Sequence, residues 1–128
     1  MIGYGFVKEL ELGFDEVKKK VVDELKKEGF GVLSEIDVQA KFKEKLGVDF
    51  KKYLILGACN PPSAYKALQS EENIGLMLPC NVILYERNGG TAVGIIRPTV
   101  AMQMIENDEL RGIAREIEGK LKRTLESL

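Results

Sequence analysis

An uninterrupted apolar run at residues 53–58 constrains the fold more than any other feature of this chain. It is short, it lies between charged and turn-forming residues, and it passes directly into a Cys-Asn-Pro-Pro segment at residues 59–62. Such a run predicts a central strand, covered on both faces or lying under helices. Asparagine is a good helix N-cap and proline suits the first helical position, so a helix is expected to follow immediately, over residues 61–70.

Alternating and helical patterns precede that run. The segment around Lys8 alternates in the manner of a strand, with this lysine as the one polar residue on its apolar side. Residues 14–28 repeat apolar side chains every three or four positions, which predicts an amphipathic helix ended by Gly29. A second strand over residues 30–36 is followed by a helix that Asp37 can cap.

A hairpin and a long helix are predicted in the second half of the chain. Residues 81–86 and 91–96 form two strands joined by the turn signal at residues 88–90, Asn-Gly-Gly. After Asn107 or Asp108, apolar residues recur at helical spacing through the last predicted helix.

The order of these elements is strand, helix, strand, helix, strand, helix, hairpin and helix. Alternation followed by a hairpin favours an α+β fold: a two-layer sandwich of a mixed sheet with helices packed mainly on one face. A three-layer, doubly wound α/β fold is the alternative, because helices could divide between both faces. The 128 residues contain no repeat or linker, so a single domain is expected over residues 1–128.

Composition excludes several classes of function. Without histidine the chain has no His-based triad, general base or metal ligand. Its 19 basic and 20 acidic residues leave a net charge of -1, without the basic excess typical of nucleic-acid binders. The longest charge-free stretches have 13 residues, fewer than the roughly 18 that span a membrane. No secretory leader is visible, so a cytoplasmic location without nucleic-acid or membrane partners is expected. Abundant Lys and Glu favour a thermophilic source.

Two Cys-Asn pairs form the one constellation that could carry chemistry. Cys59 and Asn60 follow the central strand, and Cys80 and Asn81 precede the next one. If these strands are antiparallel neighbours, both thiols lie at the same end of the sheet. The helix N-terminus after Cys59 would favour its thiolate and lower its pKa. Ligands tend to bind at such strand ends, which predicts a small-ligand pocket at this edge. Arg97 is a candidate contact for an anion there, and an exposed or ion-paired arginine is the alternative.

Other interpretations of these residues stay open. Cysteine often serves as a small buried hydrophobe, and helix capping alone explains Asn60. A thiol-dependent redox or transfer enzyme would use Cys59 as its nucleophile, although a Cys-x-x-Cys motif is absent. A purely structural interaction protein would show no pocket and a large apolar interface. Tyr53 and Tyr65 flank the segment and are expected in a pocket wall or the core.

Neither a metal nor a cofactor can be assigned from the sequence. Structural zinc takes four ligands, and one chain offers two sulfurs. The ligand of the predicted pocket therefore stays unspecified.

The chain resembles the uncharacterised family known as domain of unknown function 302. The resemblance is carried by residues 56–61, Leu-Gly-Ala-Cys-Asn-Pro, and by residues 78–82, Leu-Pro-Cys-Asn-Val, with Gly75 before the second segment. A C-terminal pattern that begins at Pro98 extends it over nearly the whole chain. The resemblance implies a small α+β domain, commonly homodimeric and without an agreed activity. A homodimer is therefore expected, and symmetric dimers are also the commonest oligomers.

Overall fold

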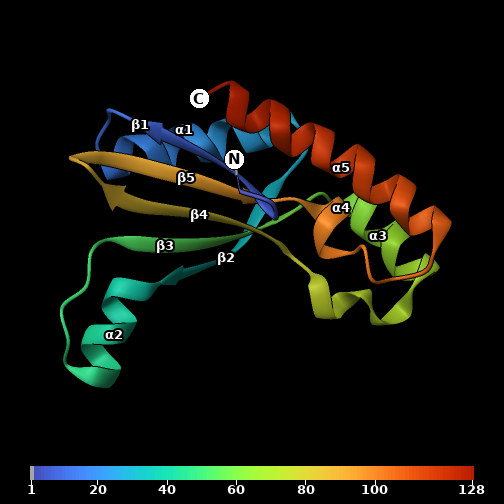
Figure 1. Ribbon diagram of the computed structural model, residues 1–128, viewed down its shortest axis with the longest axis horizontal. Coiled ribbons are helices and arrows are strands. Elements are labelled where there is room, and N and C mark those ends of the chain that lie inside the picture. The colour runs from blue at the N-terminus through green and yellow to red at the C-terminus, as the bar shows by residue number, and fades with distance from the viewer. Residues whose placement is uncertain (1) are drawn as a thin grey trace.

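Antiparallel pairing joins five strands into one open sheet with the order β1-β5-β4-β3-β2. The computed structural model describes residues 2–128 (Figure 1). The strands are β1 (Gly5–Leu10), β2 (Gly31–Asp37), β3 (Tyr53–Cys59), β4 (Cys80–Arg87) and β5 (Gly90–Ile96). The helices are α1 (Phe14–Lys27), α2 (Val38–Leu46), α3 (Pro61–Ser70), the 3-10 helix η1 (Glu72–Met77), α4 (Pro98–Ala101) and α5 (Asp108–Glu126).

The two long helices, α1 and α5, lie over the same face of the sheet (Figure 1). The expected two-layer α+β sandwich is thus confirmed. The sheet is antiparallel at each pairing rather than mixed, because α2 and α3 extend beyond the ends of the sheet instead of crossing over it. The chain therefore returns beside the strand that it has just left. A doubly wound fold, which needs parallel strands, is excluded.

Alternate residues of the inner strands form the core with these two helices. Leu56, Val82 and Val93 are fully buried on the helical side of the sheet. Val21 of α1 and Leu121 of α5 are equally buried against them. Burying a side chain of this size stabilises the fold by about 2 kcal/mol, so this layer holds the sheet and the helices together.

Lys8 interrupts the apolar side of β1 for a reason that is visible only in three dimensions. Its ammonium Nζ donates hydrogen bonds to the carbonyl oxygens of Leu125, at 3.4 Å, and Leu128, at 2.8 Å. Leu125 lies in the last turn of α5 and Leu128 lies two residues beyond this helix, and a positive charge is favourable at the C-terminal end of a helix. The lysine therefore joins β1 to the end of α5.

Local signals for chain reversal are confirmed at α1 and at the hairpin. Gly29 has φ +84°, and the next N–H, of Phe30, donates to the carbonyl of Leu25 at 2.9 Å, which is the pattern of a Schellman ending. Asn88 and Gly89 both have positive φ between β4 and β5. A two-residue turn of this kind matches the twist of the flanking strands.

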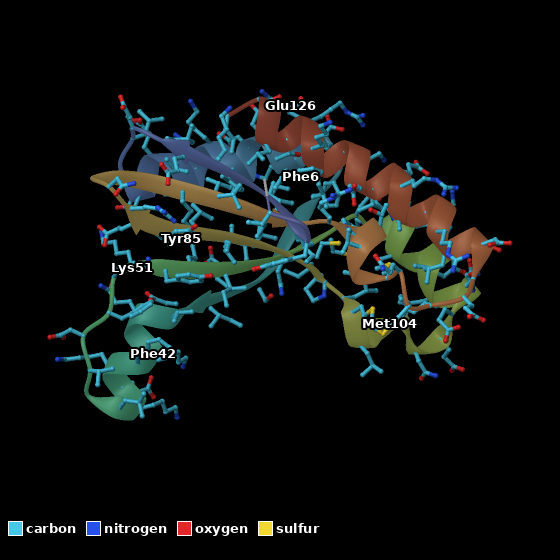
Figure 2. All side chains as sticks on the ribbon, viewed as in Figure 1. Phe6, Phe42, Lys51, Tyr85, Met104 and Glu126 are labelled. Carbon is cyan, nitrogen blue, oxygen red and sulfur yellow. The ribbon has the colours of Figure 1, made fainter. Side chains whose placement is uncertain are left out.

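Helix α2 projects from the sheet and buries none of its nine residues (Figure 1). A series of aromatic rings connects it to the sheet face opposite α1 and α5. Phe42 meets Phe50 edge-on at 5.2 Å, Phe50 lies 6.3 Å from Tyr53, and Tyr53 stacks on Tyr85 at 5.4 Å. Figure 2 shows Phe42 on α2 and Tyr85 on the sheet. Leu46 remains 68% exposed at the tip of this helix.

Among residues 2–128, no helix combines the length and the hydrophobicity that crossing a membrane requires.

Candidate functional site

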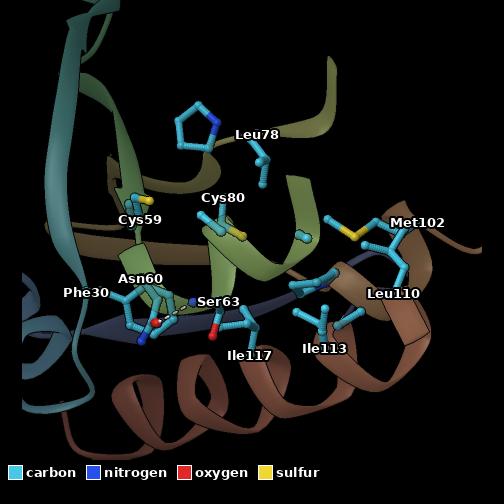
Figure 3. A pocket seen from close by; sticks show the side chains of 16 residues that line it. Phe30, Cys59, Asn60, Ser63, Leu78, Cys80, Met102, Leu110, Ile113 and Ile117 are labelled. Atoms are coloured by element: carbon cyan, nitrogen blue, oxygen red, sulfur yellow. Dashed lines mark hydrogen bonds between the residues drawn. The ribbon is translucent and has the colours of Figure 1, made fainter. Parts of the chain in front are cut away.

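The pairing of β3 with β4 brings the two cysteines to one end of the sheet. Ala58 pairs with Cys80, so Cys59 lies one residue beyond this pair. Cys80 is buried, whereas Cys59 is partly exposed, and neither forms a disulfide. Both contribute to the wall of the same cavity (Figure 3). The expectation that the thiols lie at a common sheet end is met.

This inner cavity has a volume of about 40 Å³ and lies between two buried apolar clusters. The sheet-side cluster contributes Phe30, Ala58, Cys80 and Ile117. The cluster beyond the end of the sheet contributes Ala67, Met102, Leu110 and Ala114. The remaining lining residues are Cys59, Asn60, Ser63, Ala64, Leu78, Pro79, Pro98 and Ile113. No charged side chain is among these sixteen residues.

An outer groove of about 380 Å³ lies on the other side of one cavity wall. It is lined by Leu76, Met77, Leu78, Pro79, Cys80, Asn81, Ile96, Pro98, Ala101 and Met102. Five residues line both spaces, namely Leu78, Pro79, Cys80, Pro98 and Met102. The wall between cavity and groove is therefore one layer of side chains.

Asn60 ties the start of α3 to the end of α1. Its Oδ1 accepts a hydrogen bond from the backbone N–H of Ser63 at 3.3 Å, as expected of an N-cap. Its Nδ2 donates to the carbonyl of Glu28, also at 3.3 Å. The side chain is 7% exposed. Because both ends of the amide already have partners, Asn60 is a structural link at the edge of the cavity.

Asn107 makes the same arrangement at the other end of α3. Its Oδ1 caps α5 by accepting from the N–H of Leu110 at 3.0 Å, and its Nδ2 donates to the carbonyl of Ser70 at 3.2 Å. Helix α3 is thus attached to α1 at its start and to α5 at its end. These attachments fix one wall of the cavity.

Helix α3 turns its small residues, rather than its large ones, toward the protein. Ala67 is buried, whereas Tyr65 is 66% exposed and Leu68 is 43% exposed. The expectation that Tyr65 lies in a pocket wall or the core is therefore wrong. Alanine allows α3 to lie close to α5, and the bulkier side chains are left on the outer face.

Burial raises the pKa of both thiols, which is the opposite of the expected effect of the helix N-terminus. Desolvation, with a smaller contribution from the neighbouring Cys59, raises the pKa of Cys80 to about 11. Desolvation also raises the pKa of Cys59. The apolar wall disfavours a thiolate, and Asn60 already accepts from a free N–H at the start of α3. Both cysteines are therefore protonated thiols at neutral pH.

Arg97 lies outside both walls. Its Nε donates to Oε2 of Glu118 at 3.2 Å, and its guanidinium lies over the ring of Phe6 at 5.4 Å. The same carboxylate accepts from the N–H and the hydroxyl of Thr99. Arg97 is thus engaged in joining β5 and α4 to α5, and it lines neither the cavity nor the groove that the other four candidate residues border.

Asn81 borders the outer groove and is exposed. Across residues 2–128, its side chain forms no hydrogen bond with another residue, in contrast to that of Asn60. The same described part of the chain holds no group of three Cys, Asp or Glu side chains arranged to bind a metal ion.

Several wall residues were not predicted as site residues. Leu110, Ile113 and Ile117 were expected only as core, because their helical spacing does not distinguish a core from a cavity wall. Pro98 and Met102 line the same cavity and groove as Cys80, although they lie about twenty residues later in the sequence. No local signal could have identified them.

Fold and site together define a small antiparallel α+β domain with an uncharged, thiol-bearing cavity at one end of its sheet. The chain belongs to the family described as "Domain of unknown function DUF302", whose profile matches residues 6–128. It is similar to the crystal structure of an uncharacterized conserved protein DUF302 from Bacillus stearothermophilus, with 34% sequence identity, coverage of 98% of both chains and a TM-score of 0.91. No curated protein matches the chain. The resemblance inferred from the Cys-Asn segments is thereby confirmed.

Proposed function

We propose that this protein binds a small molecule in the inner cavity and outer groove. One observation carries the proposal: both spaces lack charged lining residues, although 30% of the residues in the chain are charged. Ligand sites are typically concave, mostly apolar and equipped with a few polar groups. Asn81 and the two thiols supply such groups here.

Binding is favoured over thiol catalysis by the state of the cysteines. A nucleophilic cysteine has a lowered pKa, and burial raises the pKa of both thiols here. We assign the thiols to the wall of the site, in a cytoplasmic protein whose surroundings keep them reduced.

The methionine methyl groups provide a test. A library of small uncharged and charged compounds would be titrated into protein labelled with ¹³C at its methionine methyls. A bound compound is expected to shift the signals of Met77 and Met102, which line the groove. Met104 is 77% exposed and lies outside both walls, so its signal serves as an internal control. If no compound shifts Met77 or Met102 selectively, the proposal fails.

We also propose that a second copy of the chain covers the apolar surface beside α2. This surface, on and around α2 and β2, exposes Leu33, Ile36, Leu46, Val48 and Phe50 by 40–69%. Large exposed apolar patches are typical of protein interfaces. Light scattering is expected to give twice the chain mass of 14.3 kDa, and Leu46→Lys is expected to reduce it to one chain. A wild-type monomer at high concentration would contradict the dimer.

A further inference from the structure

We infer that the ligand is an uncharged, unbranched amphiphile whose aliphatic tail points to the inner cavity and whose hydrogen-bonding head lies at Asn81. This inference rests on the proposed binding function and specifies the chemical class of the ligand. Three properties of the site lead to it: its charge, its dimensions and the position of Asn81 in the outer groove.

The absence of charge selects an uncharged ligand. None of the residues lining the cavity or the groove is Asp, Glu, Lys or Arg. The nearby Arg97 is already paired with Glu118. A carboxylate or ammonium group in this site would lose hydration without gaining a partner of opposite charge. By contrast, the pocket at the start of α1 contains Asp15, Lys18, Asp37 and Lys52, so this protein does build charged hollows elsewhere.

The dimensions of the inner cavity select a chain rather than a ring for the part of the ligand that enters it. The inner cavity of about 40 Å³ is far smaller than the roughly 150 Å³ that admits benzene. It has room for the end of an aliphatic chain. The groove of about 380 Å³ holds on the order of a dozen groups of the size of a methylene or a water. Together they suit a tail of about eight carbons with a small head.

Met102 lies in the wall that such a tail would pass. It lines both spaces and is 8% exposed. Methionine is unbranched and flexible, so the side chain of Met102 can change its rotamer to admit a ligand, whereas the rings of Pro79 and Pro98 in the same wall are rigid. Leu76 lines the groove and is 90% exposed. An aliphatic ligand in the groove would pack against this side chain and shield it from water.

Asn81 supplies the polar end of the site. Its amide is exposed on the groove and, across residues 2–128, makes no hydrogen bond to another side chain or to the backbone. An amide both donates and accepts. A primary amide or an alcohol as the head group would satisfy both functions at once.

Three eight-carbon probes separate the ligand classes at pH 7: octanamide, octanoate and octylamine. The methyl signals of Met77 and Met102 would report binding. Octanamide is expected to bind at least tenfold more tightly than either charged probe. Asn81→Ala removes a hydrogen bond to the head group and is expected to lower the affinity for octanamide about fivefold. Asn73→Ala is the matched control, because Asn73 is also exposed but lines neither space.

A second variant tests the position of the tail. Ala64→Leu adds bulk at the wall of the inner cavity within a helix that tolerates leucine. This variant is expected to lower the affinity for octanamide more than the affinity for butanamide, because the shorter tail of butanamide does not reach the cavity. Equal weakening of both would overturn the assigned orientation.

The outcomes distinguish this inference from the proposed function. Equal or tighter binding of octanoate or octylamine overturns the uncharged class. If no eight-carbon probe binds but another compound shifts the methyl signals of Met77 and Met102, the inferred ligand class is wrong and the proposed binding function stands. If no compound of any kind shifts these signals, both fail.

Discussion

Replacement of Asn60 by alanine tests the connection between α1 and α3. The variant loses an N-cap, which costs about 1 kcal/mol. It also loses the bond from Nδ2 to the carbonyl of Glu28, which contributes about 1 kcal/mol. The position is 7% exposed, so water has little access to replace either bond. We therefore expect the free energy of unfolding to fall by about 2 kcal/mol.

Urea unfolding followed by far-ultraviolet circular dichroism would measure this change. Asn60→Ser separates the two contributions, because a serine hydroxyl can cap α3 but is too short to reach Glu28, and its expected cost is about 1 kcal/mol. Asn73→Ala, at an exposed position, is the control and should stay within about 0.5 kcal/mol of the wild type. Equal losses for Asn60→Ser and Asn60→Ala would show that the cap contributes nothing, and an unchanged stability of Asn60→Ser would show that the bond to Glu28 contributes nothing. A loss below about 0.5 kcal/mol for Asn60→Ala would refute both parts of the reasoning.

Three further expectations concern packing, charge and pH. A Cβ at Gly57 would lie 2.6 Å from Cγ of Pro79, so Gly57→Ala should cost about 2 kcal/mol in urea unfolding; Gly31→Ala, which meets no atom within 4 Å, should cost less than half of that. Lys8→Met removes the donor to the end of α5 and should lower the melting temperature, with a loss of about 1 kcal/mol; an unchanged melting temperature would contradict that role. In the unfolded chain the thiol of Cys80 ionises near its ordinary pKa of 9.0, whereas burial raises this pKa to about 11 in the fold. Stability should therefore be fully present below pH 9 and fall by roughly 3 kcal/mol as the pH rises to 11. Cys80→Ala should lack this part of the pH dependence; an identical slope in both proteins would exclude Cys80 as its source.

The boundaries of the helices were predictable because their signals are local. Asp37 and Asn60 each cap the helix that was expected after them, and Gly29 ends α1 as expected. A cap requires only residues within a few positions of one another. The role of Lys8 was not predictable, because its partners at the end of α5 lie more than a hundred residues away.

The candidate site was predictable only as far as strand pairing could be foreseen. Cys59 and Cys80 flank neighbouring strands, so antiparallel pairing brings them together. The direction of the thiol pKa shift was wrong, because a helix N-terminus is visible in the sequence and burial by α5 and α4 is not. Met102 was unforeseen as a wall residue for the same reason. For Arg97 the ion-paired alternative is confirmed, but its partner Glu118 could not be named, because it lies on a helix whose position was unknown.

The attachments of α3 at both ends also affect how this protein opens locally. Among its residues only Ala67 is buried, so α3 taken alone would separate from the protein at little cost. Its bonds through Asn60 and Asn107 connect that separation to the end of α1 and the start of α5. Amide hydrogens of α3 should therefore exchange with solvent together with those two helix ends, as one cooperative unit, rather than fraying independently of them.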